Sequence, residues 1–251
     1  MKHFTVLLAC VLAVLSAQSQ SGKKLYPLTD TQHLEALNVA VQAGVLKQQR
    51  SVKVTDIDRE ADTELRIAKL EKSYFHNGTI EVELAGQPMK NASEGARGFV
   101  GIAFRIDSSN AGFECFYLRP TNGRAADQVR RNHSAQYISY PEFPWYKLRK
   151  DFPEKYESYV DLEVGIWTKI KIEVQGNTAK LFVHNANQPT LIVSDLKHGA
   201  DAKGSIGLWI GPGTEAYFRN LVITKKINSS VFHTNATGRY NQYPKICNTI
   251  K

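Results

Sequence analysis

The sequence predicts an all-β protein in which two antiparallel sheets form a sandwich. From residue 79 onward, the chain repeats short segments rich in β-branched and aromatic residues. These segments span residues 79–84, 99–106, 113–118, 135–140, 157–163, 167–174, 178–185, 190–195, 205–211 and 216–224. Turn-forming runs such as His76-Asn77-Gly78 and Gly211-Pro212-Gly213 separate them. Many short strands joined by tight turns are typical of an antiparallel sandwich.

Alternating side chains support this fold class. In the segment 167–174, WTKIKIEV, apolar residues alternate with lysines and a glutamate, so one face is core and the other faces water. In the segment 99–106, Gly101, Ala103 and Arg105 share one face. Small residues beside a single arginine indicate a face that something approaches closely.

The first residues predict a signal peptide over positions 1–19. A basic start is followed by an apolar run from Phe4 to Leu15 and then by small residues. This run is shorter than the about 20 apolar residues that cross a bilayer, and no later segment approaches that length. We therefore expect an exported protein, periplasmic or extracellular, without a membrane span. Lipoprotein anchoring at Cys10 is less expected than cleavage near Ser19, because Leu8 is bulky where a small residue is usual.

The rest of the chain predicts one domain, a sandwich over residues 20–226. The segment 25–56 mixes weak periodicities, and we expect it to supply edge strands and a packed terminal segment. Residues 120–160 are expected to form an insertion that builds a site on one face. The polar segment 227–251 is expected to be a C-terminal extension.

Cysteine content and charge limit the function classes. Loss of residues 1–19 leaves Cys115 and Cys247, which form either one disulfide or two thiols, and the sequence does not choose between them. Two cysteines also exclude a cysteine-rich metal cluster. The net charge of +8 falls to +7 when Lys2 is removed with the leader, a modest excess without a basic run. In an exported protein this favours anionic sugars or a charged cell surface over nucleic acid.

The most informative stretch is residues 113–161, where charged residues are interspersed with aromatic residues. Aromatic rings and arginine forks are the groups that recognise hydroxyl-rich or anionic ligands. The candidate contacts to carbohydrate are Arg119, Asn122, Arg124, Arg131, Gln136, Tyr137, Trp145, Tyr146 and Tyr159. Two structural alternatives stay open: a loop held by its own Arg–Asp bonds with Asp127 as anchor, and aromatics that form a satellite core.

The candidate catalytic residues are Glu157, His133 and Asp161. Glycoside hydrolysis needs two carboxyl groups, one protonated and one ionised. Glu157 and Asp161 would share a face of the predicted strand 157–163, with α-carbons about 13 Å apart. That is too far for a retaining pair on backbone distance alone, although the side chains could converge for an inverting pair. Glu114 is an alternative second carboxylate, and His133 could move a proton near neutral pH. The acids would otherwise pair with nearby arginines.

No sequence pattern requires a cofactor, although a divalent cation such as calcium stays an option. His133 with Glu157, Asp161 or Asp127 offers metal ligands. Asp107, Ser108 and Asn110 offer calcium ligands, but an ordinary turn is the favoured interpretation there.

The order of these motifs carries a resemblance. GIAFRI, FECFYLRPTNGRA, RRNHSAQY, the run W-x-K-x-K-I-E-V-Q-G and GSIGLWIGPGTEAYFRNLVIT together resemble the concanavalin A-like (laminin G-like) jelly-roll β-sandwich. More closely, they resemble bacterial 3-keto-disaccharide hydrolases, over about residues 72–224. The resemblance implies cleavage of glycosidic bonds in 3-keto disaccharides or related glycosides, with a metal conceivable to polarise the ketone.

Two functions of different class therefore stay open, beside a third possibility, a surface adhesion or assembly domain that uses the same face for a protein partner. One is an exported enzyme in which a base removes the proton beside the ketone and the glycosidic oxygen leaves. The other is a carbohydrate-binding, lectin-like module without catalysis, because jelly rolls of this kind also bind sugars. The E-x-D-x-x-E strand motif of laminarinase-like jelly-roll glycosidases is absent.

Overall fold

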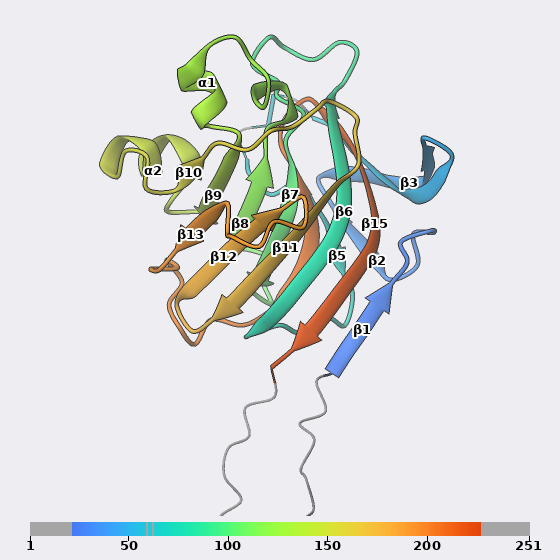
Figure 1. The fold of residues 1–251 in the computed structure, drawn as a ribbon. Helices are drawn as coiled ribbons and strands as arrows, with labels where there is room; N and C mark the ends of the chain where they lie inside the picture. The colour runs from blue at the N-terminus through green and yellow to red at the C-terminus, as the bar shows by residue number, and fades with distance from the viewer. Residues whose placement is uncertain (1–21, 59, 62, 227–251) are drawn as a thin grey trace, which may run out of the picture. The chain divides into compact units, whose positions relative to one another are not determined.

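The computed structural model describes residues 22–58, 60, 61 and 63–226, which form two antiparallel sheets and three short helices (Figure 1). The eight-stranded sheet has the order β13-β12-β11-β6-β15-β4-β3, with β1 paired to β15. Its strands are β1 (Gly22–Tyr26), β3 (Val39–Leu46), β4 (Gln49–Asp56), β6 (Gly78–Pro88), β11 (Thr168–Gln175), β12 (Thr178–Val183), β13 (Leu191–Val193) and β15 (Thr214–Lys225).

The seven-stranded sheet has the order β10-β9-β8-β7-β14-β5-β2. Its strands are β2 (Leu34–Leu37), β5 (Ile67–Leu70), β7 (Val100–Ile106), β8 (Phe113–Leu118), β9 (Ala135–Tyr140), β10 (Glu157–Ser158) and β14 (Ser205–Ile210). The helices are the 3-10 turn η1 (Pro120–Asn122), α1 (Gln128–Asn132) and α2 (Trp145–Asp151). The predicted fold class, an all-β jelly-roll sandwich of two antiparallel sheets, is confirmed.

The core lies between the inner faces of the two sheets, as the alternation predicts. In β11, Ile170, Ile172 and Val174 are buried while the intervening lysines are exposed or half-buried. On the facing sheet, Phe104 of β7 stacks on Phe116 of β8 with ring centroids 6.2 Å apart. Each such side chain contributes about 1.5–3 kcal/mol by leaving water, so these two faces supply the main stabilisation of the fold.

The N-terminal part of the described chain supplies edges. β3 ends the order of one sheet and β2 ends the order of the other, whereas β1 lies beside β15. These three strands bury few side chains, and β1 is almost wholly exposed, so this part of the chain contributes little to the core.

The predicted strand 157–163 is much shorter in the structure. Only Glu157 and Ser158 pair with β9, opposite Gln136 and Ala135, and β10 is the last strand of its sheet. The alternation of ESYVDLE therefore does not reflect a strand beyond Ser158, because the partner strand β9 begins at Ala135, opposite Ser158. The α-carbon separation expected for Glu157 and Asp161 from strand geometry does not apply.

The face of β7 that carries Gly101 and Arg105 is approached closely, as expected, and by this chain itself. A side chain on Gly101 would meet Phe116 O at 2.2 Å and the Cβ of Tyr117 at 2.5 Å, so only glycine fits against β8. Arg105 has a φ of 56° and its side chain is 1% exposed. Its guanidinium donates to the carbonyl oxygens of His76, Gly199 and Gly176 at 2.7–3.1 Å. Arg105 thus ties three loops together at one end of the sandwich.

Several predictions concern residues outside the described part of the chain. The signal peptide 1–19 with Cys10, the extension 227–251 and Cys247 all lie there. Cys115 is a buried free thiol in the described residues, and burial raises its pKa well above the ordinary value. No helix among the described residues is long and apolar enough to cross a membrane.

Candidate functional site

A pocket of about 940 Å³ lies at the end of the sandwich where the β6–β7 loop, the segment after β8, helix α2 and the turn at Pro212 meet. In Figure 1 both α1 and α2 lie at this side, beside β8, β9 and β10. Four arginines line the pocket: Arg97, Arg119, Arg130 and Arg149. Phe99, Asn122, Asp127, His133 and Trp145 also line it. The pocket therefore joins cationic forks with aromatic rings, the combination predicted from the sequence.

Local sequence fixes the segment 119–134 that forms one wall. Asp127 caps α1, because its side chain accepts the backbone N–H of Arg130 at 2.7 Å. Asn122 donates to the backbone oxygen of His133 at 3.2 Å and accepts from Nε of Arg130 at 3.0 Å. At Gly123 a side chain would meet the backbone nitrogen of Leu162 at 2.3 Å, so glycine lets that segment pack on the wall. These contacts hold the side chains of Asn122 and Arg130, which both line the pocket, in fixed positions.

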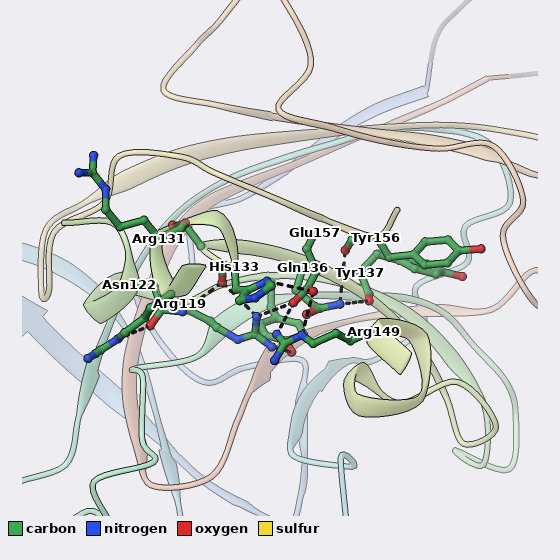
Figure 2. A network of polar contacts seen from close by, with 12 residues as sticks. Arg119, Asn122, Arg131, His133, Gln136, Tyr137, Arg149, Tyr156 and Glu157 are labelled. Carbon is green, nitrogen blue, oxygen red and sulfur yellow. Dashed lines mark hydrogen bonds and ion pairs between the residues drawn. The ribbon is translucent and has the colours of Figure 1, made fainter. Parts of the chain in front are cut away.

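Glu157 is the centre of the polar network beside the pocket (Figure 2). Its carboxylate accepts from Arg119 Nη1 at 3.1 Å and from Arg149 Nε at 2.9 Å, with a further close contact to Arg149 Nη2. His133 Nδ1 lies 3.0 Å from Glu157 Oε2, in a close contact that is not a well-aligned hydrogen bond. Pairing of β10 with β9 places Glu157 at this point, because Glu157 stands opposite Gln136 at the sheet edge.

The protonation states follow from this environment. Burial acts to raise the pKa of Glu157, but hydrogen bonds from Arg149 and the charges of Arg119 and Arg149 outweigh it and lower the pKa below the ordinary value. Burial lowers the pKa of His133, and the two arginines act in the same direction against the opposing attraction of Glu157. Near neutral pH the site therefore holds an ionised Glu157 and a neutral His133.

Aromatic rings frame the arginines. The guanidinium carbon of Arg119 lies 5.8 Å from the ring centre of Trp145 and 5.9 Å from that of Phe99. Arg149 lies 4.8 Å from the Trp145 ring. Trp145 is nevertheless 37% exposed, so part of its ring stays open to a ligand at the pocket.

The structure brings five of the sequence candidates together: Arg119, Asn122, His133, Trp145 and Glu157. All but Glu157 line the pocket itself. Glu157 lines a smaller neighbouring cavity of about 270 Å³, which it shares with His133. His133 therefore stands between the two cavities.

The other candidates lie outside the pocket, although Tyr159 lines the smaller cavity with His133 and Glu157. Asp161 accepts two hydrogen bonds from Arg124 at 2.7 and 2.9 Å in a half-exposed ion pair outside the pocket. Arg131 points away from Glu157 in Figure 2, and it donates to Tyr159 Oη at 3.0 Å while stacking on that ring. Neither pair adds a carboxylate to the pocket.

Three further candidates split between core and surface. Tyr137 is fully buried, and its hydroxyl contacts the buried Glu114, so it does not face the pocket. Gln136 is buried beside Glu157 and donates to the backbone oxygens of Tyr137 and Tyr156 at 3.0 and 3.4 Å. Tyr146 is exposed on α2, with its ring edge-on to Trp145 at 5.8 Å.

Sequence reasoning missed four pocket residues: Arg97, Phe99, Arg130 and Arg149. Arg149 carried a usable signal, because it follows Trp145 by four residues in the helix α2 and so shares its face. Arg97 and Phe99 carried none, because they come from the loop after β6 and lie outside the stretch 113–161.

The described residues contain no cluster of three histidine, cysteine, aspartate or glutamate side chains that could hold a metal ion. At the turn considered for calcium, Asp107 accepts from the backbone N–H groups of Ser109 and Ala111 at 3.0 and 2.9 Å. Its carboxylate is thus used to close the turn.

No protein-family model and no curated protein matches the sequence, so membership of the 3-keto-disaccharide hydrolase family stays a prediction. Solved structures are similar in fold. A Bacillus subtilis protein of unknown function with a galectin-like fold is 11% identical, with a TM-score of 0.49 over 80% of this chain and 94% of that one. The carbohydrate-binding module CBM66 from Bacillus subtilis is 10% identical, with a TM-score of 0.45 over 75% and 97%. A Bacillus licheniformis β-glucanase is 13% identical, with a TM-score of 0.45 over 83% and 100%. These similarities concern the fold and assign no activity.

Proposed function

We propose that this protein binds carbohydrate in the arginine-lined pocket and acts outside the cytoplasm. The observation that carries the proposal is the partly exposed Trp145 ring beside four guanidinium groups in one pocket. An aromatic face packs on the C–H face of a pyranose, while planar forks donate to its hydroxyl oxygens. A volume of about 940 Å³ lies at the upper end of the range typical of small-ligand sites.

Binding without hydrolysis fits the state of the acidic groups. A hydrolase of the usual kind needs a protonated carboxyl group to assist departure of the leaving group. Arginine contacts lower the pKa of Glu157, so it stays ionised and is unsuited to donate a proton. Asp127 lines the pocket, but its side chain caps helix α1. No other carboxyl group is present among the described residues of the pocket, and Glu154, which shares the smaller cavity with Glu157, is exposed to solvent.

A test of this function is isothermal titration of the purified protein with a panel of oligosaccharides. Trp145→Ala should weaken binding by about tenfold or more, because loss of a buried ring contact is worth roughly 1.4 kcal/mol or above. Tyr74→Ala is the matched control, since Tyr74 is an exposed aromatic residue outside the pocket. Binding that survives Trp145→Ala unchanged, or no binding to any sugar, would overturn the proposal.

The second candidate is an enzyme that eliminates the leaving group from a 3-keto-glycoside. The 3.0 Å contact between His133 Nδ1 and Glu157 Oε2 favours it, because it places a carboxylate beside a ring that also lines the pocket. A neutral imidazole can then accept the proton beside the ketone. The electron pair passes into an enolate near the arginines and next expels the glycosidic oxygen, which takes the proton from the imidazolium ring. Water later adds to the double bond.

The two candidates separate in one assay. The protein is incubated with natural and 3-keto disaccharides, with and without a chelator, and products are followed by mass spectrometry. Turnover that His133→Asn abolishes would establish the enzyme, and its loss on chelation would add a metal. Binding without turnover leaves the carbohydrate-binding function.

A further inference from the structure

The charges of the pocket do not balance. Arg97, Arg119, Arg130 and Arg149 line it, and Glu157 beside it accepts from Arg119 and Arg149. The remaining carboxylate, Asp127, accepts the backbone N–H of Arg130 and forms no ion pair with a pocket arginine in the described residues. The pocket therefore carries an excess of positive charge.

Arg97 and Arg130 have only uncharged partners within the described ranges. Arg97 uses one nitrogen, Nη1, which donates to the backbone oxygens of Glu94 and Ala96. Arg130 donates from Nε to Asn122 Oδ1 at 3.0 Å and from Nη2 to Thr121 Oγ1 at 3.0 Å. Both guanidinium groups are held in place by neutral acceptors, and each keeps N–H donors that the described residues do not use.

The two groups also repel each other. Both residues contact Thr121, because its backbone N–H donates to the Arg97 oxygen at 3.3 Å and its hydroxyl accepts from Arg130 Nη2 at 3.0 Å. Burial and then the charges of Arg130 and Arg119 lower the pKa of Arg97 accordingly. Both side chains are half-buried, and such a cluster is costly unless an anion joins it. A guanidinium group that is held in place and has no carboxylate partner is typical of a site that binds an anionic group through two hydrogen bonds.

The aromatic part of the site lies next to this cationic part. Phe99 follows Arg97 by two residues, and Arg119 lies 5.9 Å from the Phe99 ring and 5.8 Å from the Trp145 ring. A ligand that reaches from Arg97 to Trp145 would thus place its charge at one end of the pocket and a sugar ring at the other. This arrangement favours a carbohydrate that carries a negative charge next to a sugar ring.

We propose that the natural ligand is an acidic carbohydrate whose carboxylate or sulfate ester binds Arg97 and Arg130, while a neighbouring ring contacts Trp145. This inference rests on the proposed carbohydrate-binding function and deepens it. The same forks accept a uronate or a sulfate ester, because both present planar or trigonal sets of oxygen acceptors with negative charge.

The test compares matched sugars by isothermal titration of the purified protein. A galacturonate oligosaccharide is paired with the neutral galactose oligosaccharide, and a sulfated galactose oligosaccharide is paired with the same neutral one. We expect an acidic ligand to bind about tenfold tighter or more, because one charge-assisted hydrogen bond is worth roughly 1.5–3 kcal/mol. Its affinity should also fall as salt rises from about 0.05 to 0.3 M. The tighter of the two acidic ligands identifies the anionic group.

Variants assign the preference to residues. Arg97→Gln and Arg130→Gln should each reduce the ratio of acidic to neutral affinity towards one, and Arg97→Lys, which keeps the charge but loses the fork, should reduce it less. Arg50→Gln is the control, since it removes an exposed charge on β4 outside the pocket. Circular dichroism checks that each variant is folded.

The outcomes distinguish the two proposals. If neutral and acidic sugars bind equally, or if the preference survives both Arg97→Gln and Arg130→Gln, the acidic-ligand inference is overturned while carbohydrate binding stands. If no sugar of any class binds, the proposed function itself fails. A preference that Arg50→Gln removes as strongly would also overturn the assignment, because it would reflect overall charge.

Discussion

Arg105 and the pocket arginines differ in what their guanidinium groups bind. Arg105, at the end of the sandwich tied by the loops after β5, β11 and β13, donates to three backbone carbonyl oxygens and is 1% exposed. Arg97 and Arg130 are half-buried, line a pocket and retain unused donors among the described residues. Arg119 and Arg149 stand between these extremes, because they share the carboxylate of Glu157.

The difference teaches what makes an arginine structural in this fold. Backbone carbonyls are fixed acceptors, so a guanidinium that is surrounded by them closes loops and leaves nothing for a ligand. A guanidinium group that is held on one side by a neutral amide or by a shared carboxylate has a fixed orientation. It still has N–H groups that can donate to a ligand. Burial alone does not separate the two cases, because Arg119 is as buried as a structural arginine yet lines the pocket.

The largest expected effect is at Arg105. Arg105→Met should lower the free energy of unfolding by about 3 kcal/mol or more, because three buried carbonyl oxygens lose their donor. Sugar affinity of the folded protein should be unchanged, since Arg105 does not line the pocket. Urea unfolding followed by circular dichroism measures the first quantity and titration the second. If the folded Arg105→Met variant bound sugar more weakly, the pocket would depend on Arg105, which contradicts the independence of the two regions.

Glu157 should affect both the free energy of unfolding and the sugar affinity. Glu157→Gln should cost about 2 kcal/mol of stability, because Arg119 would keep a buried charge without its counter-charge. Affinity for neutral sugars should weaken about threefold or more, because Arg119 and Arg149 lose the group that orders them, at about 0.5–1.5 kcal/mol each. The measurements are urea unfolding and titration.

The control for Glu157 is Glu163→Gln. Glu163 pairs with Arg124 at 2.9 Å, but about half of each side chain is exposed. We expect no resolvable change in either measurement for this variant. If Glu157→Gln changed stability but not sugar affinity, Glu157 would, like Arg105, stabilise the fold without contributing to ligand binding.

The pH dependence of stability should carry a contribution from His133. Because burial lowers its pKa below 6.5, the unfolded chain binds more protons than the folded one as pH falls below about 6.5, and stability decreases. Glu157 acts with the same sign at lower pH: its contribution is fully present above about 4.5 and is lost as the pH falls through its lowered folded pKa.

His133→Asn should therefore flatten the fall in stability between about pH 7 and pH 5 and leave the fall below about pH 4.5 in place. Urea midpoints at several pH values measure this. His33→Asn is the control, because His33 is exposed and has a φ of 69°, which asparagine tolerates. An unchanged slope in His133→Asn would mean that the ring is not desolvated as the structure has it.

The sequence contained the information for the fold because alternation is local. The period of two in WTKIKIEV is enough to place Ile170 and Ile172 in the core, and the structure does so. The same pattern misled at ESYVDLE, because a strand needs a hydrogen-bonding partner and β9 begins at Ala135, opposite Ser158. Alternation reports which side chains share a face and says nothing about whether a neighbouring strand is present.

The site was less accessible to sequence reasoning because it forms where separate segments meet. Trp145 and Arg119 stand out locally, but the charge excess depends on Arg97, which comes from a loop far away in the chain. Tyr137 and Gln136 show the limit of composition. They are neighbours on β9 and point to opposite faces, so one reaches the core and the other the vicinity of Glu157.

The smallest expected effect is at the exposed pair of Arg124 and Asp161. Its two hydrogen bonds of 2.7 and 2.9 Å have good geometry, yet both side chains are more than half exposed, so water competes for the same groups. Asp161→Asn should leave unfolding, sugar affinity and any turnover without a resolvable change. A clear loss of turnover would instead return Asp161 to the catalytic role expected from the sequence. If none of these quantities changes, three kinds of described arginine differ by their surroundings: Arg105 is closed by carbonyl oxygens and holds loops, the solvated Arg124 contributes little, and the arginines that line the pocket are available to a ligand.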